Sequence, residues 1–456
     1  MSETPTTRRV YLETFGCQMN DYDTARMMRL LETAGYEKVE LPKDADLILV
    51  NTCSVRDKAE QKALSRLGRL KSLRRTRPGI LLGVTGCFAQ REGEKFLRRM
   101  PYIDLILGTG AIERLPEHIR ALECGRGPIV DIDLEPTPSP VTDFGRHLPG
   151  KGSSVAAFLT IMRGCDNYCA YCVVPYVRGP ERSRPPDDIL REARGLITQG
   201  AHELTLLGQN VNSYGRGLGD EIDFPRLLTM VHDLDGLTRL RFTTSHPKDL
   251  SDRLIDAFAK LPKLAPHLHL PVQAGSNQVL ARMNRGYTVE QYLARVDALR
   301  AARPGIAVTT DILVGFPGET DDDFRQTCDL VESVRYSNAF SFRYSVRPGT
   351  AAAKWPDDVP DEQKIERLIN LQARQQRITR ELHREMVGGR VEVLVEREQT
   401  EPGLPRWSGK SGCYREVHFA GDDIGLGDMV TVEVERAFAN HLEGRAAPTA
   451  PPVQRQ

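Results

Sequence analysis

The sequence lacks any apolar segment long enough to cross a bilayer. No run approaches the roughly 18 apolar residues that a membrane-spanning helix needs. The first residues, MSETPTTRRVYLETF, also lack the apolar core of a secretory signal. We therefore expect a cytoplasmic protein with no membrane partner. At 456 residues, the chain is long enough for several domains with hydrophobic cores of their own.

The chain also lacks a net charge, because 62 Lys and Arg residues balance 62 Asp and Glu residues. A nucleic-acid partner would therefore have to contact a local basic surface. One candidate is the segment from Arg56 to Arg77, in which nine basic residues accompany two acidic ones. The segment fits a solvated helix face as well as a patch that contacts phosphates. The sequence leaves both interpretations open.

The nine cysteines are an odd number, which does not suit a framework of disulfides in a chain of this length. Three of them, Cys165, Cys169 and Cys172, lie in the segment IMRGCDNYCAYCVVPYVRGPERSR and are called the central trio below. A Cys-x3-Cys-x2-Cys loop supplies three of the four ligands of a 4Fe–4S cluster. The iron left open could chelate S-adenosylmethionine (SAM). One electron passed to its sulfonium would give methionine and a 5′-deoxyadenosyl radical.

A structural zinc site is the alternative for the central trio. Such a site needs four ligands and usually pairs two short cysteine knuckles, whereas the chain contains no second knuckle. His246 or His267 would have to supply the fourth ligand. Tyr171, next to the last cysteine, could cover the adenine of SAM or simply pack in a core.

Alternating strand and helix patterns predict an α/β protein. In a first domain, residues 8–124, apolar β-branched runs alternate with helical stretches, as in an open parallel sheet covered on both faces. The expected strands are Val10–Thr14, Leu47–Asn51, Ile80–Thr85 and Ile103–Leu107. The expected helices are Tyr22–Thr33, Val55–Leu73, Glu92–Arg99 and Ile112–Leu122.

A linker rich in proline and glycine, residues 125–154, separates this domain from a second alternation over residues 155–385. Six strand patterns there predict a partial TIM barrel of the (βα)6 type, in which ligands bind at the carboxyl ends of the strands. Residues 388–446 contain short β runs between Gly-rich turns and predict a small OB-like β-barrel that binds oligonucleotides. Residues 447–456 are expected to be a disordered tail. The six expected barrel strands are Ala157–Met162, Glu203–Leu207, Leu240–Thr244, His267–Pro271, Ala307–Val314 and Ala339–Tyr344.

Polar or Gly-rich segments end four of the predicted barrel strands: GQNVNSYG, TTSHP, LPVQAGS and DILVGFPGET. Glycine lets the backbone approach a nucleotide closely, and Gln, Asn and Ser can bond its hydroxyls. Together with the cysteine loop, five successive strand ends then form one site. We expect the residues that bind SAM to be Tyr171, Gln209, Asn210, Ser245, Gln273 and Gly315.

Three further cysteines, Cys17, Cys53 and Cys87, share a position in the predicted N-terminal sheet and are called the N-terminal trio below. The segments ETFGC, LVNTC and GVTGC each place a cysteine just beyond the carboxyl end of a parallel strand. Such ends converge on one crevice, so the three thiolates could bind a second iron–sulfur cluster with an open iron. Three buried structural cysteines remain the alternative. We interpret Cys124, Cys328 and Cys413 as ordinary free thiols.

Taken together, these motifs resemble the methylthiotransferase family of radical SAM enzymes, from about Arg9 to Glu443. TFGCQMNDYD, VNTCSVRDKAEQK and GVTGCFAQ resemble its N-terminal cluster motifs. GCDNYCAYCVVPYVRGPERSR, LGQNVNSYG, HLPVQAGS, DILVGFPGET and YSVRPGTAAA resemble its radical SAM core. The resemblance implies an N-terminal domain with a second 4Fe–4S cluster, a radical SAM core and a TRAM domain that binds RNA.

The resemblance also implies a reaction. The segments CQMN and NTCSVR are similar to those of the family members that add a methylthio group at C2 of N6-(dimethylallyl)adenosine, beside the anticodon of tRNA. Relatives that act on a ribosomal-protein aspartate or on threonylcarbamoyl-adenosine are the alternatives, and a non-catalytic zinc-bearing RNA-binding module is the alternative from another class. The implied partners are tRNA and a flavodoxin- or ferredoxin-like electron donor. We expect a monomer.

One segment departs from the family pattern. RWSGKSGCYREVHF lacks the Gly-x-Thr-x-x-Asn-like strand start of TRAM domains, which leaves the RNA contacts of this domain open. Arg406, Lys410 and Arg415 nevertheless keep the segment basic.

Overall fold

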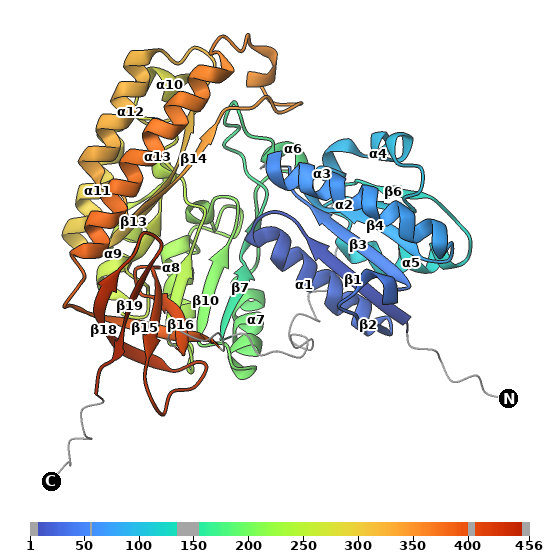
Figure 1. Ribbon diagram of the computed structural model, residues 1–456, viewed down its shortest axis with the longest axis horizontal. Helices are drawn as coiled ribbons and strands as arrows, with labels where there is room; N and C mark the ends of the chain where they lie inside the picture. Colours follow the sequence, from blue (N-terminus) through green and yellow to red (C-terminus); the bar gives the residue numbers. More distant parts are fainter. Residues whose placement is uncertain (1–7, 55–56, 135–154, 400–405, 449–456) are drawn as a thin grey trace.

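The computed structural model describes residues 8–54, 57–134, 155–399 and 406–448, which form an N-terminal, a central and a C-terminal domain (Figure 1). The α/β fold expected from the sequence is confirmed, with a parallel sheet, a partial barrel and a small closed barrel in that order. No helix among these residues is both long and apolar enough to cross a membrane.

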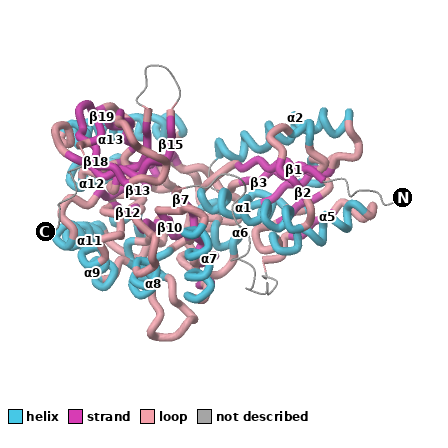
Figure 2. Tube along the Cα trace, turned by 90° about the horizontal axis from the view of Figure 1, so that it is seen from below, coloured by secondary structure: helices cyan, strands magenta, loops and turns pink. Residues whose placement is uncertain are grey.

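The N-terminal sheet has six strands in the order β2-β1-β3-β4-β5-β6, all paired in parallel. Helix α2 covers one face, and α1 and α5 cover the other (Figure 2). Two separate hydrophobic cores result, because side chains alternate between the faces along each strand. The strands are β1 Arg8–Thr14, β2 Tyr36–Lys38, β3 Leu47–Thr52, β4 Leu81–Thr85, β5 Leu105–Leu107 and β6 Ile129–Asp131. The helices are α1 Gln18–Thr33, α2 Asp57–Thr76, α3 Gly86–Glu92, α4 Glu94–Arg99 and α5 Leu115–Glu123.

The N-terminal domain differs from the expectation in the short strands β2 and β6, which were not predicted, and in helix α3. Its sixth strand, β6, lies within the segment interpreted as the linker, and residues 135–154 of that segment are outside the described residues. The short helix α3 begins directly at Gly86, whereas the sequence pattern placed a helix only from Glu92. A strand of three residues beside Gly127 and Pro128 is too short to show a periodic pattern.

The central domain contains six parallel strands in two sheets, β11-β10-β7 and β12-β13-β14, so the predicted partial barrel is confirmed. A parallel bridge between Leu240 and Leu264 lies between the two halves. Helices cover the outside of the strands, where one large core is buried. The strands are β7 Ala156–Thr160, β10 Glu203–Leu207, β11 Arg239–Phe242, β12 His267–His269, β13 Ala307–Val314 and β14 Asn338–Arg343, with a small antiparallel pair, β8 Met162–Arg163 and β9 Arg182–Ser183. The helices are α6 Val174–Arg178, α7 Pro186–Thr198, α8 Phe224–His232, α9 Asp252–Lys260, α10 Asn277–Arg282, α11 Val289–Ala302, α12 Asp321–Val334 and α13 Asp361–Arg384.

The C-terminal domain is a closed five-stranded barrel in the order β15-β16-β17-β19-β18. Three of these strands follow patterns seen in the sequence, and β16 and β19 complete the closure. The expected tail lies outside the described residues from position 449 onward. The strands are β15 Arg390–Glu398, β16 Trp407–Ser411, β17 Glu416–Ala420, β18 Met429–Ala437 and β19 His441–Ala446.

Candidate active site

The N-terminal trio lies at the carboxyl edge of the N-terminal sheet, where the strand pattern placed it. Cys17 follows β1 and is the residue before the first turn of α1, Cys53 follows β3, and Cys87 lies in α3 directly after β4. The side chains of Cys17 and Cys53 share a hydrogen bond, and Cys87 lies close enough to Cys17 to interact with its charge. The fold therefore brings together three cysteines that are 36 and 34 residues apart in the sequence.

Glycines allow these cysteine loops to approach one another. A Cβ on Gly16 would lie 2.7 Å from the Cβ of Cys53, and one on Gly86 would lie 2.5 Å from the carbonyl oxygen of Thr52. Both glycines have positive φ, at +141° and +91°, which residues with a side chain rarely adopt. In the central trio, Gly164 likewise has φ +73°, and a Cβ there would be 1.9 Å from the carbonyl oxygen of Pro180. Each Gly-Cys pair thus presents a thiol from a tightly packed turn.

A buried arginine faces each trio. Arg178, from α6, donates from Nε to Sγ of Cys87 over 3.3 Å. Arg285 donates from Nη1 to Sγ of Cys169, also over 3.3 Å, and its other nitrogens donate to Tyr287 and to the carbonyl oxygen of Pro271. Hydrogen bonds from a cation stabilise the thiolate form that iron requires. Both side chains are 4–6% exposed.

The thiol pKa values differ between positions because the surroundings differ. The hydrogen bond with Cys53, helped by the charge of Arg178, lowers the pKa of Cys17 to about 6. Burial raises the pKa of Cys87 and of Cys165, and it raises the pKa of Cys172 to about 12. A buried thiol of this kind loses its proton only when a metal takes the proton's place.

The central trio follows β8 and folds into one tight loop. The backbone N–H of Cys172 donates to the carbonyl of Cys169 over 2.9 Å, and the N–H of Cys165 donates to the carbonyl of Gly179 over 3.2 Å. No three Cys, His, Asp or Glu side chains of the described chain are grouped tightly enough to surround a single metal ion. In a cubane each of the three thiolates would bind a different iron, and the fourth iron would stay open.

The two histidines considered as zinc ligands do not complete the central trio. His246 accepts a hydrogen bond at Nδ1 from the backbone of Lys248 and packs edge-on against Tyr287. His267 stacks on Tyr414 of the C-terminal barrel at a centroid distance of 5.1 Å and bonds Thr309. Burial lowers the pKa of His246 to about 2, so this ring is neutral. Neither contact is to a thiol.

Three of the six expected SAM-binding residues leave polar atoms available at the strand ends. Both side-chain amide atoms of Gln209, Oδ1 of Asn210 and Oγ of Ser245 are buried without a hydrogen-bond partner. Unpaired buried polar atoms are rare in folded proteins and are typical of a site that a ligand fills. Tyr171 is half-buried, with its ring edge-on to Phe316 at 6.4 Å. These residues fit a nucleotide cofactor beside the central trio.

The other two expected residues are engaged by the protein itself. The backbone of Gln273, at φ +76°, bonds both Asp311 and Leu313 over 2.9 Å. The N–H of Gly315 donates to Oε1 of Glu319, also over 2.9 Å, and a Cβ there would lie 2.3 Å from Cγ of Lys364. At Gln273 and Gly315, the backbone hydrogen bonds to other protein groups and fixes the conformation of the strand ends. The side chain of Gln273 is half-buried.

The roles of Arg178 and Arg285 were not predicted from the sequence. Each arginine directly precedes a glycine. Arg178 lies in PYVRG, within the segment of the central trio, and Arg285 lies in MNRGY, shortly after the HLPVQAGS segment. An arginine beside glycine usually indicates an exposed turn. A signal was nevertheless present, because Arg178 lies six residues after Cys172 on the same short loop and helix.

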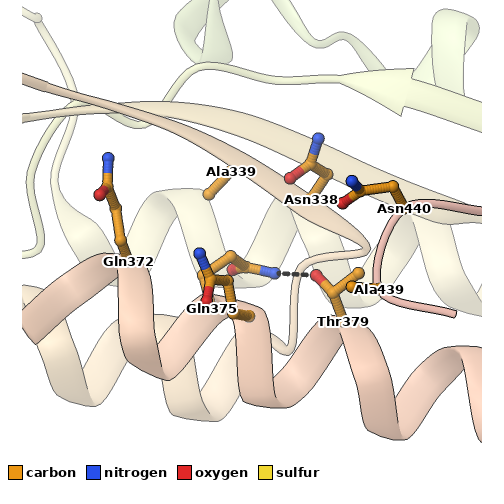
Figure 3. A pocket seen from close by; sticks show the side chains of 8 residues that line it. Asn338, Ala339, Gln372, Gln375, Thr379, Ala439 and Asn440 are labelled. Carbon is orange, nitrogen blue, oxygen red and sulfur yellow. Dashed lines mark hydrogen bonds between the residues drawn. The ribbon is translucent and has the colours of Figure 1, made fainter. Parts of the chain in front are cut away.

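A separate hollow of about 420 Å³ lies between α13, β14 and the turn from β18 to β19, and it contains no cysteine (Figure 3). Amide side chains dominate its walls, and Gln375 donates across one wall to Thr379 over 3.0 Å. It does not belong to the cysteine site. Its lining residues are Asn338, Ala339, Gln372, Gln375, Gln376, Thr379, Ala439 and Asn440.

Comparison with known proteins agrees with this geometry. Residues 9–108 match the model of the uncharacterized protein family UPF0004, and residues 159–331 match the radical SAM superfamily. In fold, the chain is similar to the radical SAM methyltransferase TsrM from Kitasatospora setae with tryptophan substrate and a SAM analogue bound, at a TM-score of 0.58 and 18% identity over 76% of this chain and 75% of that one. The structure of TsrM with cobalamin and a 4Fe–4S cluster bound has a TM-score of 0.55 and 16% sequence identity to this chain. The match covers 76% of this chain and 74% of that one.

Much closer relatives match almost end to end. The tRNA-2-methylthio-N(6)-dimethylallyladenosine synthase of Syntrophotalea carbinolica is 47% identical over 95% of this chain and 99% of that protein. The enzymes of the same name from Geobacter sulfurreducens and Burkholderia vietnamiensis are 49% and 46% identical, over 95% and 96% of this chain and 96% and 97% of those proteins. The chain therefore belongs to the tRNA-2-methylthio-N(6)-dimethylallyladenosine synthase family of radical SAM proteins.

Proposed function

We propose that this chain is a tRNA methylthiotransferase. It adds a methylthio group at C2 of N6-(dimethylallyl)adenosine next to the anticodon, which gives 2-methylthio-N6-(dimethylallyl)adenosine. The observation that carries the proposal is the pair of cysteine trios, each facing a buried arginine. One trio lies at the carboxyl ends of the parallel strands β1, β3 and β4, and the other lies in the loop after β7 and β8. Two clusters with an open iron suit a sulfur insertion, for which radical formation alone is insufficient. The names of the full-length relatives support the same substrate.

In this proposal, Cys165, Cys169 and Cys172 hold the 4Fe–4S cluster that binds SAM, and Cys17 and its two partners hold the second 4Fe–4S cluster. When bound, SAM and the clusters supply a methyl group, an electron and a radical that abstracts hydrogen. The protein shields the clusters from solvent, since four of the six cysteines are buried and the other two, Cys17 and Cys172, are partly buried. The SAM-binding residues in this proposal remain Tyr171, Gln209, Asn210, Ser245, Gln273 and Gly315.

The chain's own residues have definite tasks in this scheme. Arg178 and Arg285 hold thiolates by charge-assisted hydrogen bonds. The unpartnered atoms of Gln209, Asn210 and Ser245 orient the nucleoside and the amino-acid portion of SAM. The neutral ring of His246 supplies Nε2, which is buried without a partner, as a further donor or acceptor.

The substrate is tested by mass spectrometry of tRNA nucleosides from a strain in which the gene is deleted. We expect the 2-methylthio group on dimethylallyladenosine to disappear and to return when the gene is supplied. An unchanged nucleoside profile contradicts the proposal. Loss of the methylthio group from threonylcarbamoyl-adenosine, or from a ribosomal-protein aspartate, would assign one of the two related substrates in its place.

The two-cluster division is tested in anaerobically reconstituted protein, which we expect to carry about eight irons, four for each cubane. Cys165→Ala should abolish SAM cleavage, whereas Cys17→Ala should leave SAM cleavage and remove the methylthiolated product. Cys124→Ala is the matched control, because Cys124 is an exposed free cysteine outside both trios. Full product formation by Cys17→Ala would overturn the division of labour.

Further features of the proposal concern partners and organisation. We propose a cytoplasmic monomer that receives electrons from a flavodoxin- or ferredoxin-like protein, because tRNA and such donors are cytoplasmic and SAM cleavage needs one electron. The proposed domains are residues 8–124, 155–385 and 388–446, with the linker 125–154 and the tail 447–456. Light scattering of the purified protein tests the monomer, and a mass of two chains would contradict it.

A further inference from the structure

Arg178 belongs to the central domain but reaches the cysteines of the N-terminal domain. It ends α6, which follows directly after the central trio. Its Nε donates to Sγ of Cys87 over 3.3 Å, and its Nη2 donates to Asp23 over 2.8 Å and to Asn20 over 3.1 Å. One side chain therefore connects the loop that carries the central trio to the site of the N-terminal trio.

The surroundings fix this side chain from several sides. Asp23 is buried and balances the guanidinium charge, and the amide of Asn20 is held by its own bond to the carbonyl of Phe15 over 2.9 Å. Cys87 packs with Val173 and Val177 of the same loop and helix. The guanidinium is therefore placed by the docking of two domains, and it has little freedom to move.

One nitrogen of Arg178 has no partner within the described residues. Nη1 is buried and makes no hydrogen bond there, and the residue as a whole is 6% exposed. A buried N–H of a guanidinium without an acceptor is unfavourable unless something else supplies the acceptor. The neighbours Cys17 and Cys87 are cluster ligands in the proposed function. A sulfur anion bound at that cluster could therefore accept the hydrogen bond from Nη1.

We propose that Arg178 is the positioning residue for the sulfur that is transferred. Through Nε it holds the thiolate of Cys87, and through Nη1 it binds the hydrosulfide or alkylthiolate anion that reaches the open iron of the N-terminal cluster. The inference rests on the proposed function, since it requires that cluster. A cation next to the cluster also raises its reduction potential, because it stabilises the additional negative charge of the reduced form.

The position of Arg178 on α6 adds a second consequence. The loop of the central trio carries the arginine, so the sulfur site is complete only when the two domains are docked. Thr109 of the N-terminal domain donates to the carbonyl of Val177 over 2.6 Å and also accepts a hydrogen bond from Arg163. Arg163 is thus a second arginine that crosses the same interface, but it bonds a backbone carbonyl and no sulfur.

The experiment compares Arg178→Gln, Arg178→Lys and the control Arg163→Gln as full-length holoenzymes. Methanethiolate is titrated in the presence of saturating SAM, which occupies the open iron at the central trio. The electron paramagnetic resonance spectrum of the reduced N-terminal cluster reports binding. We expect Arg178→Gln to weaken methanethiolate binding at least tenfold and to shift the cluster potential to more negative values. Arg178→Lys should have a methanethiolate affinity and a cluster potential between those of Arg178→Gln and the unmodified protein. Lysine keeps the positive charge but lacks the planar guanidinium with its several donors.

The outcomes separate the inference from the function on which it rests. Binding and potential like those of the unmodified protein in Arg178→Gln, or equal losses in Arg163→Gln, would overturn the role of Arg178. An unmodified holoenzyme with only about four irons would overturn the proposed second cluster itself. If Arg178→Gln assembles no second cluster, Arg178→Lys is compared with the unmodified protein. Methanethiolate affinity equal to that of the unmodified protein in Arg178→Lys contradicts a role for the guanidinium group.

Discussion

Cys17 shows how one residue can be prepared for metal binding by its neighbours. It precedes the first turn of α1, bonds Cys53 and lies near the charge of Arg178, and its pKa falls to about 6. In the iron-free protein, we expect iodoacetamide to modify Cys17 at a rate that rises between pH 5 and pH 7 and then levels off. The sign follows because the reactive thiolate forms as pH rises through the pKa.

Peptide mass mapping of the alkylated protein measures this rate. Cys172, whose pKa burial raises to about 12, should stay unmodified over the same range. Arg178→Gln should move the midpoint for Cys17 upward, because a positive charge that favours the thiolate is lost. A midpoint near the usual thiol value of about 8.5 in the unmodified chain would contradict the role given to these neighbours.

Gly164 tests how closely the central trio is packed. Gly164→Ala introduces both a disfavoured positive φ and a Cβ 1.9 Å from the carbonyl of Pro180, so the turn before Cys165 must move. Gly305→Ala is the matched control, because Gly305 has φ +77° but no atom within 4 Å of the new Cβ. We expect the control to lose about 1–2 kcal/mol of stability and keep its iron.

Iron content and SAM cleavage after reconstitution separate the two variants. Gly164→Ala should lose most of the SAM cleavage, since a shift of the Cys165 loop misplaces one ligand. Equal SAM cleavage in Gly164→Ala and Gly305→Ala would show that close packing at Gly164 does not position the cysteine.

At the scale of elements, the start of α12 ties two strand-end loops together. Thr320 and Asp323 form a capping box, in which each side chain accepts a hydrogen bond from the other's backbone N–H. Asp323 also accepts a hydrogen bond from Ser276, in the loop after β12. We expect Thr320→Ala to cost about 1 kcal/mol. Asp323→Ala should cost more, because it removes its half of the capping box and also leaves the buried hydroxyl of Ser276 without its acceptor.

Thermal unfolding midpoints of the iron-free variants measure this order. Asp322→Ala is a suitable control, since Asp322 is exposed in the same turn and, within the described part of the chain, pairs only with Arg325 and Gln326. A larger loss in Thr320→Ala than in Asp323→Ala would contradict the linking role of Asp323. Thr320, the last residue of the DILVGFPGET segment, therefore has a structural role at the start of α12.

The order of elements was predictable where strands are long and buried. β3 is an apolar run with β-branched residues, and the cysteines that follow it and its neighbours β1 and β4 predicted the N-terminal trio. The central trio was predicted from the spacing of its own cysteines. The short strands β2 and β6 could not be predicted, because three residues show no period. The arginine contacts to sulfur could not be predicted either, because Arg178 and Cys87 are 91 residues apart and meet only across a domain interface.

The basic segment after Cys53 is another case that needed the fold. Arg66 pairs with Glu13, and Arg74 pairs with Asp104, so part of the segment stabilises the N-terminal domain. Lys62 and Arg69 are exposed on α2. The number of basic residues can be read from the sequence. The structure is needed to show which of them already form ion pairs within the domain.

At the scale of the whole molecule, buried arginines join the C-terminal barrel to the central domain. Arg241 donates to the carbonyl of Ser411 over 2.6 Å and to that of Gly412 over 2.8 Å, and Arg239 donates to the carbonyl of Lys410 over 2.9 Å. Glu203 lies between the two arginines and pairs with both. The barrel that is expected to contact RNA is therefore held at a fixed orientation to the SAM site.

This junction gives a prediction for substrate binding. Arg241→Ala removes the hydrogen bonds to Ser411 at the end of β16 and to Gly412 just after it. It also leaves Glu203 with one partner, and losing one member of a buried pair costs about 3–5 kcal/mol. We expect faster hydrogen exchange in β16 and weaker tRNA binding, whereas SAM cleavage without tRNA stays close to normal because the central trio is untouched. Arg253→Ala is the control, since Arg253 is exposed and pairs with Asp223 at the surface. If Arg241→Ala binds tRNA as the control does, the junction does not orient the barrel for its substrate.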